Sequence, residues 1–310
     1  MAQRLKDKSA VVTGAGGGIG KAIALALVEE GANVVVNDLG GTLDGTSSSA
    51  TPADETVAMI KKAGGKAVAN YDSVVDFTSA KRIIDTCVEH FGKLDILVNV
   101  AGILRDRMVF NMSAEEWDAV LKVHLYGTFN CCRHACALMR QQRSGRIINT
   151  TSDAWVQTVG HVNYGAAKGG IVTLTKSIAR EMGRYGVTCN VFAPVAATRM
   201  TLSEETKAGF KKRYEAGLVT KERYEELVGM PGPEFVGPFI AYLATDEAAD
   251  INGCVFQVSG GRVGLYSEPQ LTRFIFKTEG KRTVDELVKE VPKSLTQGIA
   301  NPAPPKQVTK

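Results

Sequence analysis

The sequence predicts an α/β fold, in which a doubly wound parallel sheet forms a single domain and a C-terminal extension follows. Short runs rich in β-branched residues alternate with longer stretches of helical periodicity, which is the pattern of parallel strands joined by crossover helices. Runs such as Ile-Leu-Val-Asn and Arg-Ile-Ile-Asn are apolar without polar alternation, as expected for strands buried on both faces. A glycine-rich turn directly follows the first run.

Strands and helices can be assigned along the chain from these patterns. The two longest helical stretches are Ser113–Met139 and Tyr164–Tyr185, and Ser113 with Glu116 fits a capping box. We expect these two helices also to provide the contact surface of a homodimer or homotetramer. The runs expected to be strands are Ser9–Thr13, Asn33–Asp38, Lys66–Tyr71, Leu94–Asn99, Arg146–Thr151, Thr188–Ala193 and Val255–Val258.

Three segments interrupt this alternation. Leu39–Pro52 is rich in Gly, Ser and Thr, and we expect either a mobile surface loop or a tolerated insertion. The charged segment at about 198–233 follows the carboxyl end of a strand, where open α/β sheets bind ligands, so we expect a substrate lid. The main domain is expected over 1–263 and the extension over 264–310, with one amphipathic stretch at Thr283–Leu295.

The composition is that of an ordinary globular protein, with 44% hydrophobic residues and a formal net charge of +4. No apolar stretch is long enough to span a membrane, and no basic stripe indicates nucleic-acid binding. The six cysteines lack paired metal-ligand spacing, so we expect reduced thiols and no metal site. Because we find no secretory pattern and no Ser-Lys-Leu peroxisomal address, we expect a cytoplasmic location.

Gly14, Gly18 and Gly20 lie between the first strand and the next helix. Glycines at such a turn remove the Cβ atoms that would block a pyrophosphate, and the helix N-terminus supplies free N–H groups. Ile19 takes the last glycine position of the usual Gly-x-Gly-x-x-Gly pattern, so the spacing here is Gly-x-x-x-Gly-x-Gly. The turn, including Ile19, predicts a Rossmann-like dinucleotide site. A glycine-rich turn without a ligand is the alternative.

Two aspartates end predicted strands on the same edge of the sheet. Asp38 can accept hydrogen bonds from a ribose diol and would repel a 2′-phosphate, and no basic residue directly follows it. The sequence therefore favours NAD over NADP, with a turn-initiating aspartate as the alternative. Asp72 ends the third strand, where it could meet the adenine or cap the next helix.

Tyr164 and Lys168 lie four residues apart at the start of a predicted helix, so both project from one face. A phenol is a poor acid or base at its usual pKa of about 10, and a fixed positive charge nearby favours the phenolate. Ser152 follows a strand that ends at the same edge, where its hydroxyl can bind a substrate carbonyl. The three residues predict an alcohol/carbonyl oxidoreductase. Alone, the Tyr-x-x-x-Lys pair is common on helix surfaces.

Together with the stretch from Asn99 to Gly102, these motifs resemble the short-chain dehydrogenase/reductase family over roughly Leu5 to Gly261. The resemblance implies that Ser152 positions substrate, that Tyr164 is the acid/base, and that Lys168 contacts the ribose and lowers the pKa of Tyr164. Together with Tyr164 and Lys168, the further cofactor contacts that it implies are Ser73, Asn99, Ala101, Gly102, Pro194 and Thr198.

The sequence departs from the family pattern at two positions. The family usually places its Ser thirteen residues before the Tyr, whereas Ser152 is twelve before Tyr164 and Thr151 is at thirteen. We favour Ser152, with a loop shortened by one residue, and keep Thr151 as the alternative. His124 stands where most members carry an Asn that completes a proton relay. A neutral imidazole can still pass protons, and a helix histidine bonded only to backbone is the alternative.

The stretches around Asp38, Asp72, Gly102 and His124 together resemble the dehydrogenase part of peroxisomal multifunctional enzyme type 2. This resemblance implies NAD-dependent oxidation of a (3R)-hydroxyacyl-CoA to the 3-ketoacyl-CoA, with a separate hydratase as a partner. The alternatives are a hydroxysteroid or other bulky secondary alcohol as substrate, or a non-catalytic NAD-binding subunit. Three arginines that could meet CoA phosphates, unless they are simply solvated, are Arg105, Arg107 and Arg199.

Overall fold

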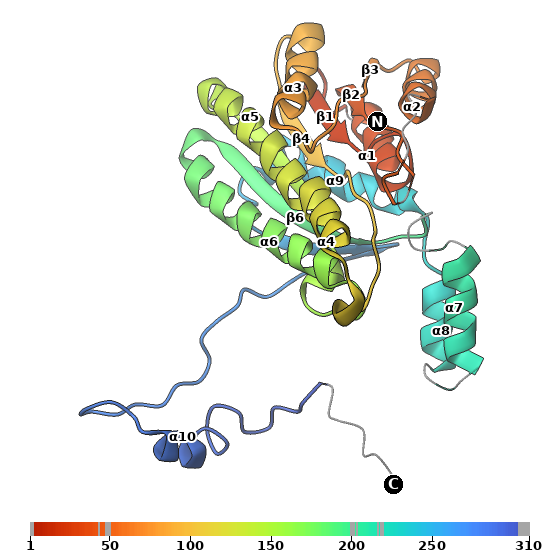
Figure 1. The fold of residues 1–310 in the computed structure, drawn as a ribbon. Helices are drawn as coiled ribbons and strands as arrows, with labels where there is room; N and C mark the ends of the chain where they lie inside the picture. Colours follow the sequence, from red (N-terminus) through yellow and green to blue (C-terminus); the bar gives the residue numbers. More distant parts are fainter. Residues whose placement is uncertain are drawn as a thin grey trace. The chain divides into compact units, whose positions relative to one another are not determined.

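The computed structural model describes residues 3–42, 44–46, 51–198, 202, 204–215, 217 and 220–302. Within these residues, eight strands form one sheet in the order β3-β2-β1-β4-β5-β6-β7-β8 (Figure 1). All neighbours from β3 to β7 pair in parallel, which confirms the predicted fold class. The strands are β1 (Ser9–Thr13), β2 (Asn33–Asn37), β3 (Ala67–Asn70), β4 (Ile96–Asn99), β5 (Gly145–Thr150), β6 (Val187–Val195), β7 (Val255–Ser259) and β8 (Arg262–Leu265).

Helices connect the strands and cover both faces of the sheet. The α-helices are α1 (Gly18–Glu29), α2 (Thr51–Lys62), α3 (Phe77–Phe91), α4 (Ala114–Leu121), α5 (Gly127–Gln142), α6 (Val162–Met182), α7 (Glu204–Glu215), α8 (Lys221–Val228), α9 (Gly237–Leu243) and α10 (Val284–Glu290). Single turns of 3₁₀-helix are η1 (Val109–Asn111), η3 (Asp153–Trp155), η4 (Gly183–Tyr185), η5 (Pro233–Phe235) and η6 (Asp246–Ala248), and η2 (Lys122–Tyr126) is a π-helix.

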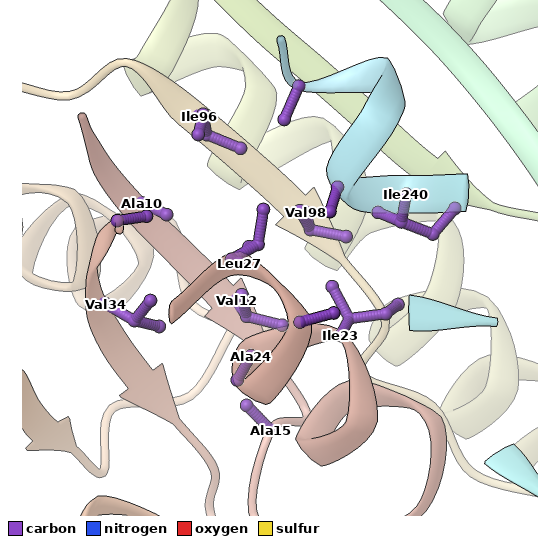
Figure 2. Close-up of a cluster of buried hydrophobic side chains, with 14 of the residues drawn as sticks. Ala10, Val12, Ala15, Ile23, Ala24, Leu27, Val34, Ile96, Val98 and Ile240 are labelled. Atoms are coloured by element: carbon purple, nitrogen blue, oxygen red, sulfur yellow. The ribbon is translucent and has the colours of Figure 1, made fainter. Parts of the chain in front are cut away.

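Two hydrophobic cores hold the sheet between its helical layers. Ala10 and Val12 of β1 face the core formed with α1, α2 and α9, whereas Val11 faces the core formed with α3, α5 and α6. Figure 2 shows the first core, where Ile23 and Leu27 of α1 lie against β1 and β4. Because the central strands are apolar on both faces, their position in the layers is fixed from both sides. Their carboxyl ends therefore form a rigid edge for a site.

Among the strands of the described sheet, the antiparallel strand β8 is the one that the sequence analysis did not predict. It pairs with β7 through the register Ser259↔Arg262 and Val258↔Val263, after a turn at Gly260 with a φ of +54°. Its side chains are mostly exposed, because it is an edge strand with one neighbour. A buried apolar run, the signal that revealed the parallel strands, is therefore absent from it.

The stretch Ser113–Met139, expected to be one helix, is divided by the π-helix η2. The capping box of Ser113 and Glu116 begins α4 as predicted, and α5 begins only at Gly127. His124 lies within η2 and is 2% exposed. A π-helix of one turn widens the helix locally and is often found at functional sites.

The chain divides into two compact units, Met1–Tyr266 and Ser267–Lys310. The first unit ends slightly later than residue 263 because β8 and Tyr266 belong to the sheet, where the Tyr266 amide donates to the Val255 carbonyl. In the second unit, α10 begins with a capping box of Thr283 and Glu286. No helix among the described residues is long and apolar enough to cross a membrane.

Candidate active site

The glycine turn joins β1 to α1 in a conformation that only glycine adopts easily. Gly14 has a φ of +67°, and a Cβ there would lie 2.8 Å from the Ala101 backbone. A Cβ on Gly20 would overlap the Gly14 carbonyl, so the helix and the turn touch through their backbones. Gly17 is the N-cap of α1 and provides no capping side chain, whereas Ile19 packs against the first core. The turn presents uncapped N–H groups beside a surface without Cβ atoms, which suits a phosphate.

Asp38 follows β2 and lies against the glycine turn. Its carboxylate accepts hydrogen bonds from the backbone N–H of Gly16 at 2.8 Å and of Gly40 at 2.6 Å. Each oxygen receives one of these bonds, so each keeps a free lone pair. The carboxylate can therefore accept a further hydroxyl group at the edge of the turn.

Asp72 and Ser73 make contacts within the protein. The Asp72 carboxylate accepts from Arg82 Nε at 2.8 Å and from Asn70 Nδ2 at 3.0 Å. The N-cap of α3 is Asp76, so the alternative that Asp72 caps this helix is wrong. The Ser73 hydroxyl accepts from the Val75 N–H at 3.2 Å.

The stretch from Asn99 to Gly102 leaves the sheet beside the glycine turn. Thr13 Oγ1 accepts from the amides of Val100 at 3.1 Å and Ala101 at 3.3 Å, which fixes β4 to β1 at this edge. The Asn99 side chain is buried and donates to Asn149 Oδ1 at 2.9 Å. Asn99 therefore acts within the sheet through its side chain, and Ala101 contributes backbone to the wall behind Gly14.

Ser152, Tyr164 and Lys168 come together where β5 ends and α6 begins. Ser152 is the N-cap of η3, where its hydroxyl accepts from the Ala154 amide at 3.3 Å, and it lies close enough to Tyr164 to lower the pKa of that phenol. Lys168 is 3% exposed, and its Nζ lies 5.4 Å from the centroid of the Tyr164 ring. Among the described residues, the acceptor for Lys168 Nζ is the Thr150 carbonyl at 2.8 Å. The Tyr164 phenol thus lies between the Ser152 hydroxyl and the buried Lys168 amine.

Thr151 points away from this group. It is 1% exposed, and its hydroxyl donates to the Lys168 carbonyl at 2.9 Å. Its amide donates to the Phe192 carbonyl at 2.8 Å, which continues the ladder to β6. Thr151 thus anchors α6 to the sheet, and Ser152 is the hydroxyl that reaches Tyr164.

Comparisons with known proteins identify the family. The sequence profile of the short chain dehydrogenase family matches residues 8–208. The chain belongs to the short-chain dehydrogenase/reductase family. It is similar to a crystal structure of a short chain dehydrogenase from Mycobacterium avium, with a TM-score of 0.78, 42% identity and coverage of 97% of this chain and 98% of that chain.

Curated relatives support the same family. A short-chain type dehydrogenase/reductase of Mycobacterium tuberculosis is 46% identical over 84% of this chain and 84% of its own length. A hydroxyacyl-CoA dehydrogenase of the same organism is 43% identical over 87% of this chain and 82% of its length. Peroxisomal multifunctional enzyme type 2 of Mus musculus is 41% identical over 93% of this chain, which spans 36% of that enzyme. Both parts of the resemblance stated from the sequence are confirmed, and the chain is an oxidoreductase.

His124, at the position where the family resemblance implies an Asn, lies beside Tyr164. Its Nε2 lies 2.8 Å from the Ile103 carbonyl oxygen, and its ring meets the Tyr164 ring edge-on at 5.2 Å. A Cβ on Gly102 would overlap this ring, so a glycine there makes room for the histidine. In the described structure His124 Nδ1 is buried without a hydrogen-bond partner. The Ile103 amide also lies 3.1 Å from Nε2, so the tautomer decides the roles of the two nitrogens: if Nε2–H donates to the Ile103 carbonyl, Nδ1 is an acceptor.

Burial dominates the electrostatics of the group. It raises the pKa of Tyr164 to about 12, and the nearby Ser152 hydroxyl acts in the opposite direction. Burial also lowers the pKa of Lys168 to about 7. For His124, burial and then the charge of Lys168 lower the pKa to about 3, so its imidazole is neutral at physiological pH. The unliganded site therefore favours neutral side chains.

Of the remaining predicted site residues, Pro194 lies near the end of β6 and Thr198 follows that strand. Pro194 is in β6, paired with Val258, and a Cβ on Gly18 would lie 3.6 Å from Thr198 Cγ2. Within the segment expected to be a lid, α7 and α8 are joined by stacked rings of Tyr214 and Tyr224 at 4.9 Å. Other parts of that segment, including Arg199, lie outside the described residues.

Two further polar residues hold the site and were not singled out from the sequence. Asn163 is fully buried and donates to the carbonyls of Arg105 at 3.0 Å and Glu116 at 3.1 Å, while its Oδ1 accepts from the Tyr164 amide at 2.7 Å. His161 pairs with Asp106 at 2.8 Å across the same loops. Only their position just before Tyr164 could have drawn attention to them.

The geometry of the glycine turn leads to a prediction on stability. Gly14→Ala should lower the free energy of unfolding by about 1–3 kcal/mol, because alanine is strained at positive φ and its Cβ meets the Ala101 backbone. Gly17→Ala is the matched control, since its φ of −162° suits any residue and nothing lies within 4 Å of the new Cβ. Urea unfolding of both variants measures the difference. Equal stability of the two would contradict the steric account.

Proposed function

We propose that the chain is an NAD-dependent dehydrogenase that oxidises a (3R)-hydroxyacyl-CoA to the 3-ketoacyl-CoA. The observation that carries the reaction type is the grouping of half-buried Ser152 and Tyr164 with the buried Lys168 at the edge of the sheet. The names of similar proteins, a hydroxyacyl-CoA dehydrogenase and peroxisomal multifunctional enzyme type 2, support the substrate class. Family members typically bind NAD or NADP.

The residues present fit a nicotinamide dinucleotide. Gly14, Gly18 and Gly20 would hold the pyrophosphate beside the start of α1, where a Cβ is excluded. Asp38 would accept from the adenosine ribose with its free lone pairs. Lys168 has three N–H groups and one acceptor among the described residues, so ribose hydroxyls would complete its hydrogen bonds.

The catalytic residues divide the work of alcohol oxidation. The Ser152 hydroxyl would hydrogen-bond the substrate oxygen and keep it beside Tyr164. Tyr164, as phenolate, would accept the proton of the substrate hydroxyl, and the charge of Lys168 would stabilise that phenolate. When bound, NAD supplies the acceptor for the hydride that leaves the carbinol carbon. In this direction the rate should rise with pH as Tyr164 loses its proton, and in reduction the neutral phenol is the active form.

We assign His124 a supporting role in the same site. Since its imidazole is neutral, His124 does not add a second positive charge beside Lys168. Its Nδ1 would accept a hydrogen bond from a water molecule in the site, while Nε2 holds Ile103 in place. This acceptor replaces the one that the usual Asn provides in the relay to the lysine.

Two features are compatible with a CoA ester and with an oligomer. Arg105 Nε is buried without a partner in the described structure, whereas Arg107 is paired with Glu116 at 2.7 Å, so Arg105 is the better candidate for a phosphate.

On the outer side of the long helices, Tyr126 is 57% and Phe129 45% exposed, which supports a homodimer or homotetramer through these helices. A separate hydratase would supply the hydroxyacyl-CoA.

The Tyr164→Phe variant tests the reaction mechanism. It removes only the phenolic hydroxyl, so turnover should fall by about 10²–10⁴-fold while NAD affinity, measured by calorimetry, stays the same. Tyr242→Phe on α9 is the control, because that ring is 42% exposed and belongs to none of the contacts described for the site. Unchanged oxidation by Tyr164→Phe would refute the mechanism.

The choice of cofactor rests on Asp38. In the parent chain kcat/KM should be higher with NAD than with NADP, because a 2′-phosphate would lie beside the carboxylate. Asp38→Ala should reduce that preference by about tenfold or more, since one unfavourable charge contact is removed. Asp85→Asn, which removes an exposed carboxylate on α3, should leave the preference unchanged. A parent chain that prefers NADP would disprove the assignment.

The substrate class is separated by steady-state rates. We expect (3R)-hydroxyacyl-CoA esters to be oxidised with a higher kcat/KM than hydroxysteroids or other free secondary alcohols, because only the esters offer phosphates to Arg105. Faster turnover of a steroid would favour the alternative substrate. Binding of NAD without turnover of any alcohol would favour a non-catalytic subunit.

A further inference from the structure

Asp153 directly follows Ser152 and is bound by the last hairpin of the sheet. One carboxylate oxygen accepts from the Tyr266 hydroxyl at 2.5 Å, and the other accepts from Gln257 Nε2 at 2.8 Å. Gln257 belongs to β7, and Tyr266 directly follows β8. The residue beside the proposed catalytic serine is thus held by two donors that are more than a hundred residues away in the sequence.

The Tyr266 ring is itself fixed in place. It meets the Trp155 ring edge-on at 5.4 Å and packs against a small core of Ile171, Val172, Val191 and Val255. Its amide donates to the Val255 carbonyl at 2.9 Å. Burial and the Asp153 carboxylate raise the pKa of Tyr266 to about 12, so its hydroxyl remains a donor at physiological pH.

Ser152 has few contacts of its own to fix its position. Its backbone is extended, with φ −158° and ψ 155°, and its hydroxyl accepts from the Ala154 amide at 3.3 Å. On one side Thr151 anchors the chain to β6 and α6. On the other side the anchor is Asp153. The orientation of Ser152 therefore depends on its two neighbours.

We propose that Asp153, Tyr266 and Gln257 form a hairpin clamp that positions Ser152, given that Ser152 and Tyr164 act as proposed above. The three are positioning residues, because they act through Ser152. The clamp gives the antiparallel strand β8 a role in the site, since β8 delivers Tyr266 to the end of β5. The position of the Ser152 hydroxyl relative to the substrate oxygen then depends on the edge hairpin as well as on the parallel sheet.

The charge of Asp153 shows that its role is geometric. A carboxylate near Tyr164 raises the pKa of the phenol and so opposes formation of the phenolate. A negative charge at this place is thus a cost to alcohol oxidation, which the clamp offsets by holding Ser152. The groups that face Tyr164 are Ser152, Lys168, His124, Asp106 and Asp153.

Kinetics of Tyr266→Phe, Asp153→Asn and the double variant test the clamp. Tyr266→Phe keeps the ring and its packing, so we expect kcat to fall by about fivefold with unchanged KM for NAD and an unchanged melting temperature. Asp153→Asn should also lower kcat, and it should move the acid limb of the pH profile to lower pH because the opposing charge is gone. Tyr266→Phe retains that charge, so its acid limb should stay in place.

The double variant decides whether the two residues act as one unit. The kcat of the double variant should be no lower than the lower of the two single-variant values. A loss of kcat equal to the product of the two single losses would overturn the clamp. A parent-like kcat for Tyr266→Phe would overturn it too, as would parallel losses of kcat, NAD affinity and melting temperature, which indicate a merely structural role. Tyr242→Phe is the control. If Tyr164→Phe stays active, the proposed function fails; if Tyr164→Phe is inactive and Tyr266→Phe is parent-like, only the clamp fails.

Discussion

The burial of the Lys168 amine is the constraint on which the rest of the site depends. An ammonium group out of water is costly unless it is paired, and here burial lowers its pKa to about 7. Its Nζ is held by the Thr150 carbonyl, while its own carbonyl accepts from Thr151. The same burial raises the pKa of Tyr164 to about 12 in the unliganded chain. In the unliganded chain the described structure therefore gives the Lys168 amine one hydrogen-bond acceptor. The ribose hydroxyls of a bound dinucleotide would provide the others.

This arrangement requires strand ends that do not move. The two cores pack against β1, β4 and β5 from both faces. The glycine turn, Ala101 and Ser152, which follow these strands, are therefore held at fixed distances from one another at one edge of the sheet. Polar side chains then lock the loops above that edge, as Thr13 does for Ala101 and Asn163 for the start of α6. Burial thus has two effects. It sets the geometry of the sheet, and it sets the protonation of the residues at its edge.

The parts of the molecule that follow from local pattern were predictable from the sequence. Buried strands such as Ile96–Asn99 appear as unbroken apolar runs, and the Ser113 capping box is a local signal for the start of α4. The edge strand β8 lacks such a run, and the π-helix around His124 is a single turn, too short to leave a periodic pattern in the sequence. The contacts of Asp72 with Arg82 and of Asp153 with Tyr266 join distant segments, so spacing alone could not reveal them. The family resemblance implies the roles proposed for Ser152 and Lys168, but it does not reveal the partners that hold them.

The central claim, that the charge of Lys168 governs ionisation of Tyr164, is tested most directly by the pH dependence of kcat in Lys168→Met. Methionine keeps the length and apolar stem of the side chain and removes its charge. With NAD and alcohol both saturating, kcat reports the ionisation of the bound complex. Loss of a nearby cation disfavours the phenolate, so the account predicts that the acid limb of alcohol oxidation moves to higher pH. An acid limb at the same pH as in the parent chain would contradict it.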